Sequence, residues 1–469
     1  MTVEAAAATL LEHFDTALAN AARRPRPTLA TASVRVDGAA LDPAAEAVGG
    51  RLADDRWFCW EQPDEGFALA GLGEAHAVVT RGPDRASDLI GETAELMASR
   101  CSSGDEELEP GAGPVWVGGM SFAPDGAASG PWSSFAPARM ACPELALACR
   151  DGHTTVTAAA LVRDEADIAA GRRALEGRLA RLGDHRLPMR DPWPTGRCSV
   201  SSARAPGDFE DAVSQAAAAI RAGRLDKVVL AREVRVQAPT AYDAGALFGA
   251  LRESFPSCFC FAVGTPEAAF CGASPELLVR RRGQGASTVA LAGSTRRSAD
   301  PALDDHLGEQ LLRSAKDRRE HEVVVERIQR TLRPWSVWVQ AEPDPVVIQV
   351  ANIQHLATPI HALLSQAHGA VELAARLHPT PAVGGEPWDL ARELLAPLEQ
   401  MDRGWYAGPV GWMDAAEDGD FCVALRSALL RDRTAHLFAG VGVVGASDPT
   451  AELAETELKL QALLPLVTG

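Results

Sequence analysis

The sequence changes character near Pro206, and this change limits the folds that are possible. Up to about residue 200, short elements alternate with connections rich in Ala, Gly and Pro, such as the turn or linker candidates 24–27 and 190–194. Beyond Pro206, motifs follow one another with few loose segments. We interpret residues 1–200 as a variable N-terminal portion and 201–469 as the portion that carries the functional motifs, and the two need not be independent domains.

The second portion has a clear pattern of helices and strands. Helices are predicted over 208–222 and 307–332, and an Asp-Pro pair at 448–449 opens a last helix. Strands are predicted over 227–236, 258–262, 421–430 and 436–444. Earlier in the chain, the pattern predicts a buried strand over 115–122 and a helix over 165–182.

Charge and cysteine content exclude several classes of protein. The net charge of −18 and the pI of about 5.1 argue against a nucleic-acid or anionic-membrane binder, since both need a basic face. No apolar run is long enough to span a bilayer, and the acidic N-terminus does not resemble a signal peptide. The nine cysteines include no CxxC pair, so we expect neither disulfides nor structural zinc, and a cytoplasmic location.

Lysine is rare in this chain. Lysine and arginine together number 45, yet the lysines are Lys227, Lys316 and Lys459 alone. Arginine stays protonated at physiological pH, whereas a desolvated lysine can lose its proton and act as a base or nucleophile. Chance retention explains any one of them, but all three lie in motif-like contexts. The lysines are therefore candidate functional residues.

The last helix carries a candidate metal site. Glu452, Glu455 and Lys459 are spaced so that all three share one helical face. Spacing alone favours an ordinary surface Glu–Lys pair, worth about 0.3 kcal/mol. The alternative is a pair of carboxylates for a hard divalent cation such as Mg²⁺.

Two other glutamates stand in unusual positions. Glu320 precedes apolar residues at steps of four in the 307–332 helix, so it lies near the apolar stripe and needs a partner or a metal. Glu276 follows a Ser-Pro turn at the head of a strand, where apolar surroundings could raise its pKa and let it donate a proton. The simpler alternatives are an arginine-paired Glu320 and a solvated Glu276.

Residues 440–445 match the pattern GxGxxG. The dinucleotide-binding fingerprint also needs a crossover helix, a further strand and a later acidic residue, and too little chain follows. We therefore interpret these glycines as letting the backbone approach an anion closely.

Taken together, the motifs of residues 206–465 resemble the chorismate-utilising enzymes, which include isochorismate, salicylate, anthranilate and aminodeoxychorismate synthases. The motifs that carry the resemblance occur in family order: 227–232 (KVVLAR), 272–278 (GASPELL), 291–294 (LAGS), 314–321 (SAKDRREH), 354–356 (QHL), 377–384 (LHPTPAVG), 402–412 (DRGWYAGPVGW) and 439–459. The 115–122 segment (VWVGGMSF) is similar to the N-terminal Gly-Gly strand of the family.

The resemblance implies a fold of the α/β class (α+β type), a single large domain with layered antiparallel sheets, outer helices and a buried cleft. It also implies roles for residues. Lys227 matches the general base and Glu276 the general acid. The implied Mg²⁺ ligands are Glu320 and Glu455, with Glu452 close enough to be a third ligand or to act through one of the ligands. The positions that match substrate-binding residues are Gly293, Ser294, His355, Tyr406, Arg426, Gly440 and Lys459.

The chemistry of such a reaction agrees with these residues. Chorismate is a dianion, so an acidic protein must build a local positive site from a cation, Arg426 and Lys459. Adding water at C2 while the C4 hydroxyl leaves needs a base and an acid. A lysine at position 227 points to water rather than ammonia as the nucleophile. Ala292 replaces the lysine of aminodeoxychorismate synthases, and Ser294 stands where the family often has Thr.

The resemblance therefore predicts a Mg²⁺-dependent isochorismate synthase, with features nearer to the menaquinone type than to the compact siderophore type. The alternatives are a salicylate synthase, which would go on to eliminate pyruvate, and a non-catalytic binding relative. We expect a small-molecule substrate, no glutaminase partner, and a monomer or weak homo-oligomer. Lys316 has no assigned role at this stage.

Overall fold

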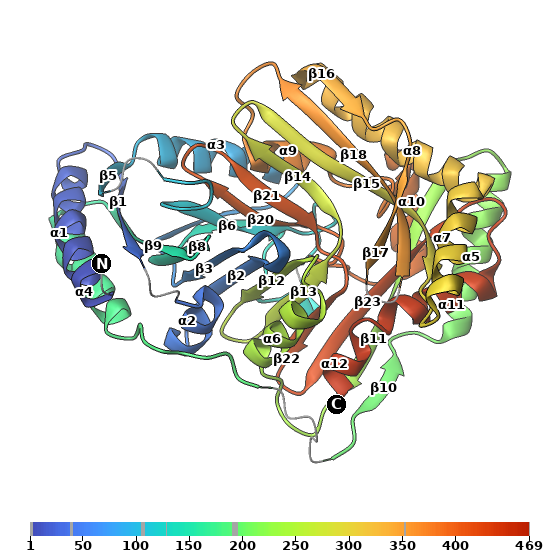
Figure 1. Ribbon diagram of the computed structural model, residues 1–469, viewed down its shortest axis with the longest axis horizontal. Helices are drawn as coiled ribbons and strands as arrows, with labels where there is room; N and C mark the ends of the chain where they lie inside the picture. The colour runs from blue at the N-terminus through green and yellow to red at the C-terminus, as the bar shows by residue number, and fades with distance from the viewer. Residues whose placement is uncertain are drawn as a thin grey trace.

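The computed structural model describes residues 3–37, 41–104, 108–127, 129–189, 196–350 and 353–468. The predicted linker at 190–194 lies outside these ranges. Two large sheets form the centre of the molecule, and helices cover their outer faces and ends (Figure 1). Among the described strands, all pairs are antiparallel except β1 with β5. This mixed, layered architecture confirms the expected fold class.

The first sheet has 13 strands and runs the length of the molecule. Its order is β10 (Ser199–Ser202), β11 (Lys227–Gln237), β23 (Thr434–Val443), β22 (Ser427–Arg431), β13 (Ala269–Ser274), β12 (Phe259–Gly264), β2 (Trp57–Gln62), β3 (Phe67–Leu72), β8 (Leu145–Arg150), β9 (His153–Val162), β1 (Thr28–Asp37) and β5 (Cys101–Gly104), with β19 (Gly385–Glu386) paired to β11.

The second sheet has ten strands. Its order is β16 (Ser336–Ala341), β18 (Ile353–Leu364), β15 (Gly285–Arg296), β14 (Leu277–Arg282), β21 (Gly419–Val423), β20 (Pro409–Asp414), β6 (Val115–Met120), β7 (Ala138–Cys142) and β4 (His76–Thr80), with β17 (Val346–Val350) paired to β18.

Helices flank the sheets at both ends of the molecule. They are α1 (Val3–Ala22), α2 (Pro43–Gly50), α3 (Arg85–Ala98), α4 (Glu165–Leu179), α5 (Pro206–Arg221), α6 (Ala244–Ser254), α7 (Pro301–Arg313), α8 (Ala315–Leu332), α9 (Ala370–Leu377), α10 (Trp388–Glu399), α11 (Pro449–Leu460) and α12 (Leu464–Thr468). In Figure 1, α1 and α4 lie together at one end, and α5, α7 and α11 gather at the other. Among the described residues, we find no helix with the length and apolar character needed to cross a membrane.

Both sheets contain strands from before and after residue 200. In the first sheet β2 pairs with β12, and in the second β6 pairs with β20. Because backbone hydrogen bonds join the two portions in each sheet, the N-terminal portion supplies structural walls for the rest.

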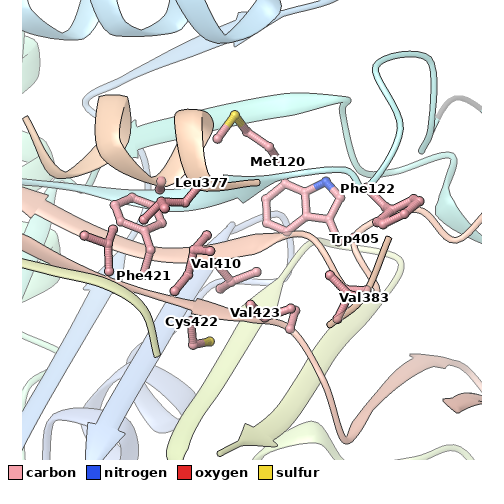
Figure 2. Close-up of a cluster of buried hydrophobic side chains, with 14 of the residues drawn as sticks. Met120, Phe122, Leu377, Val383, Trp405, Val410, Phe421, Cys422 and Val423 are labelled. Carbon is pink, nitrogen blue, oxygen red and sulfur yellow. The ribbon is translucent and has the colours of Figure 1, made fainter. Parts of the chain in front are cut away.

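The core between the sheets is densely aromatic. Figure 2 shows part of it, where Phe421, Val410 and Val423 of the central strands pack near Trp405 and Leu377. These side chains are almost completely buried, and such packing holds neighbouring strands in a defined register. The cavity described below therefore has rigid walls.

Two predicted elements are interrupted in the structure. The expected helix 307–332 is two helices, because the side chain of Ser314 accepts a hydrogen bond from the Asp317 backbone and starts α8 afresh. The expected strand 421–430 divides into β21 and β22, because Arg426 adopts a left-handed conformation with φ 45°. The final helix begins as predicted, since the side chain of Asp448 accepts from the Ala451 N–H.

Candidate active site

One cavity brings together every residue that the sequence analysis selected. It is enclosed by residues of β11, β15, β23, α8 and α11 and by the loops near them. The selected residues in its lining are Lys227, Glu276, Gly293, Ser294, Glu320, His355, Tyr406, Arg426, Gly440, Glu452, Glu455 and Lys459. A concave site with this many polar groups is suited to a small polar ligand.

Lys227 is the first residue of β11, and its side chain is almost fully buried. Its Nζ donates to Oε1 of Glu320 on α8 at 2.6 Å. Gly442 on the adjacent strand leaves room for this pair, because a Cβ there would lie 2.8 Å from both Oε1 of Glu320 and Cε of Lys227. Sequence reasoning linked this glycine to anion approach, whereas the structure gives it a role in accommodating an ion pair.

Glu276 lies in the turn between β13 and β14 and is 5% exposed. Burial is the main cause that raises the pKa of its carboxyl to about 7, while a hydrogen bond from Thr380 and the charges of Lys227 and Lys459 oppose the rise. The Thr380 hydroxyl donates to Oε1 at 3.4 Å. A carboxyl with such a pKa is partly protonated at neutral pH and can donate a proton.

Arg426 is a buried guanidinium in a strained backbone position. Its Nη2 donates to Nε2 of His355 at 3.1 Å, and its Nη1 has no hydrogen-bond partner among the described residues. Burial, followed by the charges of Arg426 and Lys459, lowers the pKa of His355 to about 3, so the imidazole is neutral and accepts this bond. A buried, unpaired guanidinium nitrogen is an anion-binding group.

The face of α11 that turns to the cavity carries a second ion pair. Nζ of Lys459 donates to the Gly440 carbonyl at 2.9 Å and lies 2.8 Å from Oε1 of Glu455. The Ser294 hydroxyl donates to the same carboxylate at 3.0 Å. Burial raises the pKa of Glu455, but the charge of Lys459 and the two hydrogen bonds outweigh burial and lower that pKa overall.

Glu452, one turn earlier on α11, is buried without such a strong partner. Burial and then the negative charges of Glu455 and Glu320 raise its pKa, against a hydrogen bond with Ser447 and the charge of Lys316. Lys316 is exposed and lines the cavity from the first turn of α8. Glu452 is thus close enough to both Glu320 and Glu455 to be repelled by their charges.

Tyr406 and Gly293 complete the lining on opposite walls. The Tyr406 ring stacks on Phe438, with centroids 5.2 Å apart, and burial raises the pKa of its hydroxyl. The hydroxyl therefore stays protonated and can donate. Gly293 has φ 74° and forms a bulge in β15, a conformation that glycine adopts readily.

The donor set fits a hard divalent cation, with a restriction. Mg²⁺ prefers a few carboxylate oxygens together with water and substrate oxygens. Glu320, Glu452 and Glu455 supply such oxygens to one cavity, and the repulsion of Glu452 by the other two favours a cation there. In the described part of the chain, however, no three His, Cys, Asp or Glu residues converge closely enough to hold a metal unaided. The set therefore suits a cation that also takes ligands from water or substrate.

Sequence reasoning missed a buried clamp behind the cavity. Arg403 donates through Nε to Oε2 of Glu399 at 2.9 Å and through Nη2 to Oε1. It also donates to the carbonyls of Val383 at 2.9 Å and Val229 at 2.7 Å. The Ala231 N–H donates to Glu399 at 2.8 Å. This clamp of Glu399 and Arg403 holds β11, and with it Lys227, against the loop that carries Thr380. In the sequence, the only sign of the clamp is the i, i+4 spacing of Glu399 and Arg403.

Comparisons with known proteins give a consistent result. The sequence model of the family described as "Chorismate binding enzyme" matches residues 16–468. The chain is 38% identical to the salicylate biosynthesis isochorismate synthase of Pseudomonas aeruginosa, covering 96% of this chain and 92% of the relative. It is 31% identical to the isochorismate synthase MenF of Bacillus subtilis, over 88% of both chains. The structure of the menaquinone-specific isochorismate synthase MenF of Escherichia coli matches with a TM-score of 0.79 and 26% identity, covering 98% of this chain and 99% of that one.

Proposed function

The chain belongs to the chorismate binding enzyme family, and we propose that it converts chorismate to isochorismate. One observation carries the proposal. A carboxyl with a near-neutral pKa, Glu276, and a buried amine, Lys227, line the same cavity as the unpaired guanidinium nitrogen of Arg426. Such a cavity combines an acid, a base and an anion-binding group, which are the parts that this reaction needs.

The proposed reaction exchanges one hydroxyl group for another. Lys227, in its neutral form, takes a proton from water as the water oxygen bonds to C2 of the ring. The ring double bonds shift, the bond between C4 and its hydroxyl breaks, and Glu276 gives its proton to the departing oxygen. One water enters and one water leaves, so the proton taken by Lys227 must return through solvent to Glu276 before the next cycle.

Positive and donor groups support binding of a dianionic substrate. The free Nη1 of Arg426 and the ammonium of Lys459 offer charge-assisted hydrogen bonds to carboxylates. The Tyr406 hydroxyl offers a neutral donor, whereas the Ser294 hydroxyl already donates to Glu455. The neutral His355 holds Arg426 in place, because it accepts from one guanidinium nitrogen and leaves the other free.

We further propose that the reaction depends on Mg²⁺, held by Glu320 and Glu455 with Glu452 beside them. When bound, the cation would supply the positive charge that neutralises a ring carboxylate. The support is the donor chemistry of the three carboxylates and the repulsion of Glu452 by the other two.

Product analysis tests the proposal. Purified protein is incubated with chorismate and Mg²⁺, with and without ammonium, and the products are separated by chromatography. Isochorismate is the expected main product under both conditions. Salicylate with pyruvate would instead identify a salicylate synthase, and an aminated product would reject water as the nucleophile. Binding of chorismate without turnover would identify a non-catalytic relative.

The pathway fed by the product is a separate matter. Relatives are named for menaquinone, for 2,3-dihydroxybenzoate and for salicylate biosynthesis. We propose isochorismate as the released product in each case, with a second enzyme consuming it. A cytoplasmic location, the absence of a glutaminase partner and a monomeric or weakly associated state stay predictions from the sequence.

A further inference from the structure

All three lysines of the chain line the same cavity. The three carboxylates of the candidate cation site line it too. Lys227 pairs with Glu320 at 2.6 Å and Lys459 with Glu455 at 2.8 Å. The third lysine, Lys316, acts by its charge on the third carboxylate, Glu452. Glu320 and Glu455 therefore each have an ammonium group in direct contact, and Lys316 lines the same cavity and acts on Glu452 by its charge.

The buried ion pair between Arg403, which also lines the cavity, and Glu399 differs from the lysine pairs. Arg403 grips both oxygens of Glu399 with two nitrogens, and backbone groups hold both side chains in place. A guanidinium fork of this kind is a fixed structural pair. Lys227 and Lys459 each contact a cavity carboxylate through a single nitrogen. A divalent cation that binds the carboxylate would therefore displace fewer hydrogen bonds than it would from a two-nitrogen arginine contact.

We propose that Lys227, Lys316 and Lys459 are exchangeable counter-ions of the Glu320, Glu452 and Glu455 site, and that each ammonium group releases its carboxylate when a divalent cation binds. This rests on the Mg²⁺ part of the proposed function. It explains why a chain that uses arginine almost everywhere keeps lysine at these positions, because a bidentate arginine would compete with the cation too strongly. It also gives Lys316 a role, as an exposed cavity-lining charge that acts on Glu452.

The scarcity of lysine makes a direct test possible. Protein labelled with ¹³C and ¹⁵N at the lysine side chains has three lysine signals, which single Lys→Arg variants assign. Mg²⁺ is added to substrate-free protein while NaCl keeps the ionic strength constant. All three signals should move on one binding curve. A Lys316 signal that stays still while the others move would remove Lys316 from the site, and no response of any lysine at millimolar Mg²⁺ would overturn the proposal.

Two substitutions of Lys316 distinguish its displacement by Mg²⁺ from a general effect of its positive charge. By calorimetry on substrate-free protein, Lys316→Arg keeps the charge but should weaken Mg²⁺ binding about fivefold, since arginine can grip Glu452 with two nitrogens. Lys316→Gln should tighten Mg²⁺ binding, since the competitor is gone. Equal Mg²⁺ affinity of the wild type and Lys316→Arg would contradict exchange.

Arg319 provides the matched control. It lies on the same helix, is 68% exposed at its side chain and pairs with Glu322 outside the cavity. Arg319→Gln removes the same charge as Lys316→Gln and should leave Mg²⁺ affinity unchanged, whereas an equal tightening would show a general charge effect and count against the proposal. Because these measurements need no turnover, a protein that fails to convert chorismate but passes them would refute the proposed function and leave this inference standing.

Discussion

At the scale of single residues, the proposed chemistry depends on two buried side chains that line one cavity. Lys227 and Glu276 are both almost fully buried. Lys227 lies beside the Glu320 carboxylate, and burial raises the pKa of Glu276 against the charges of Lys227 and Lys459. Sequence patterns selected both residues, because a rare lysine and a glutamate after Ser-Pro are visible in one dimension. The partners of these residues were not visible, because Gly442 and Thr380 reach the site only through strand pairing and a loop.

Substitutions of Lys227 should distinguish the effect of its positive charge on stability from its proposed action as a base in catalysis. Lys227→Arg keeps a cation beside Glu320 but cannot give up its proton, so kcat should fall at least about 100-fold while the melting temperature changes little. Lys227→Gln should lose activity as well, and it should also lose about 1–3 kcal/mol of unfolding free energy, because Glu320 is left without its partner. Steady-state kinetics and urea unfolding measure the two effects. Substantial turnover by Lys227→Arg would refute the assignment of the base.

Because the folded protein raises the pKa of Glu276, both the stability that it contributes and the activity that needs its proton should fall as the pH rises through about 7. The folded protein holds this proton up to about pH 7, whereas the unfolded chain loses it near its usual pKa of 4.5. The resulting stabilisation is complete below pH 4.5 and disappears as the pH rises through about 7. Activity that needs the protonated carboxyl should fall over the same upper range.

Glu276→Gln should therefore be nearly inactive, yet more stable than the wild type above pH 7, by up to roughly 3 kcal/mol. Unfolding at several pH values and the pH profile of kcat measure this. Glu61 on β2 is the matched control, since burial also raises its pKa to about 7 and it lies outside the cavity. Glu61→Gln should alter the pH dependence of stability and leave the pH profile of kcat unchanged. The role of Glu276 as acid would be excluded if Glu276→Gln kept the wild-type profile.

Arg426 combines an unpaired guanidinium nitrogen with a left-handed backbone. Arg426→Ala and Arg426→Gly should both raise the KM for chorismate at least about tenfold, because a charge-assisted contact is lost. The glycine variant should be about 1 kcal/mol more stable than the alanine variant, since only glycine adopts a positive φ without strain. Kinetics and thermal unfolding of the pair decide this. Equal stability of the two variants would show that the backbone there relaxes.

At the scale of elements, the structure depends on a few connections that tie strands and helices to the cavity. The Glu399–Arg403 clamp fixes β11, and the capped start of α8 directs Glu320 inward. The break at Ser314 was foreseeable, since Ser followed by Asp three positions later is a pattern typical of a helix start. The break at Arg426 was not foreseeable, because arginine seldom adopts the left-handed conformation that separates β21 from β22.

Removing one partner of the clamp should destabilise the whole fold. Glu399→Gln leaves the buried Arg403 charge uncompensated and should lower the unfolding free energy by about 3 kcal/mol or more. Glu309 and Arg313 form a pair with the same i, i+4 spacing on the surface of α7, so Glu309→Gln is the control and should change stability by less than about 0.5 kcal/mol. Urea unfolding compares the two. Similar small effects would mean that the clamp contributes little.

At the scale of the whole molecule, the two portions of the chain share both sheets. The family motifs were enough to predict layered antiparallel sheets around a cleft. They could not predict that β2 pairs with β12 or β6 with β20, because such pairing is set by contacts between residues far apart in sequence and carries no local pattern. The N-terminal portion was therefore the part of the fold about which the sequence said least.

This sharing predicts that neither portion folds alone. Residues 1–198 and 199–469, expressed separately, should lack a cooperative thermal transition, because each exposes the strand edges and apolar faces that the other covers. Circular dichroism and calorimetry of each fragment measure this, with the intact chain as control. Cooperative unfolding of the isolated 199–469 fragment would contradict it.

The gathering of all lysines on one cavity has a practical consequence for chemical modification. Amine-directed acylating reagents, amine-coupling surfaces and lysine-modifying enzymes find lysine targets in this protein only in the lining of the candidate active site, and Lys316 is the most accessible of them. Lysine modification, which in most proteins labels many surface positions, is here directed to the candidate active site. Labelling yield in the presence and absence of a ligand would then report occupancy of the cavity directly.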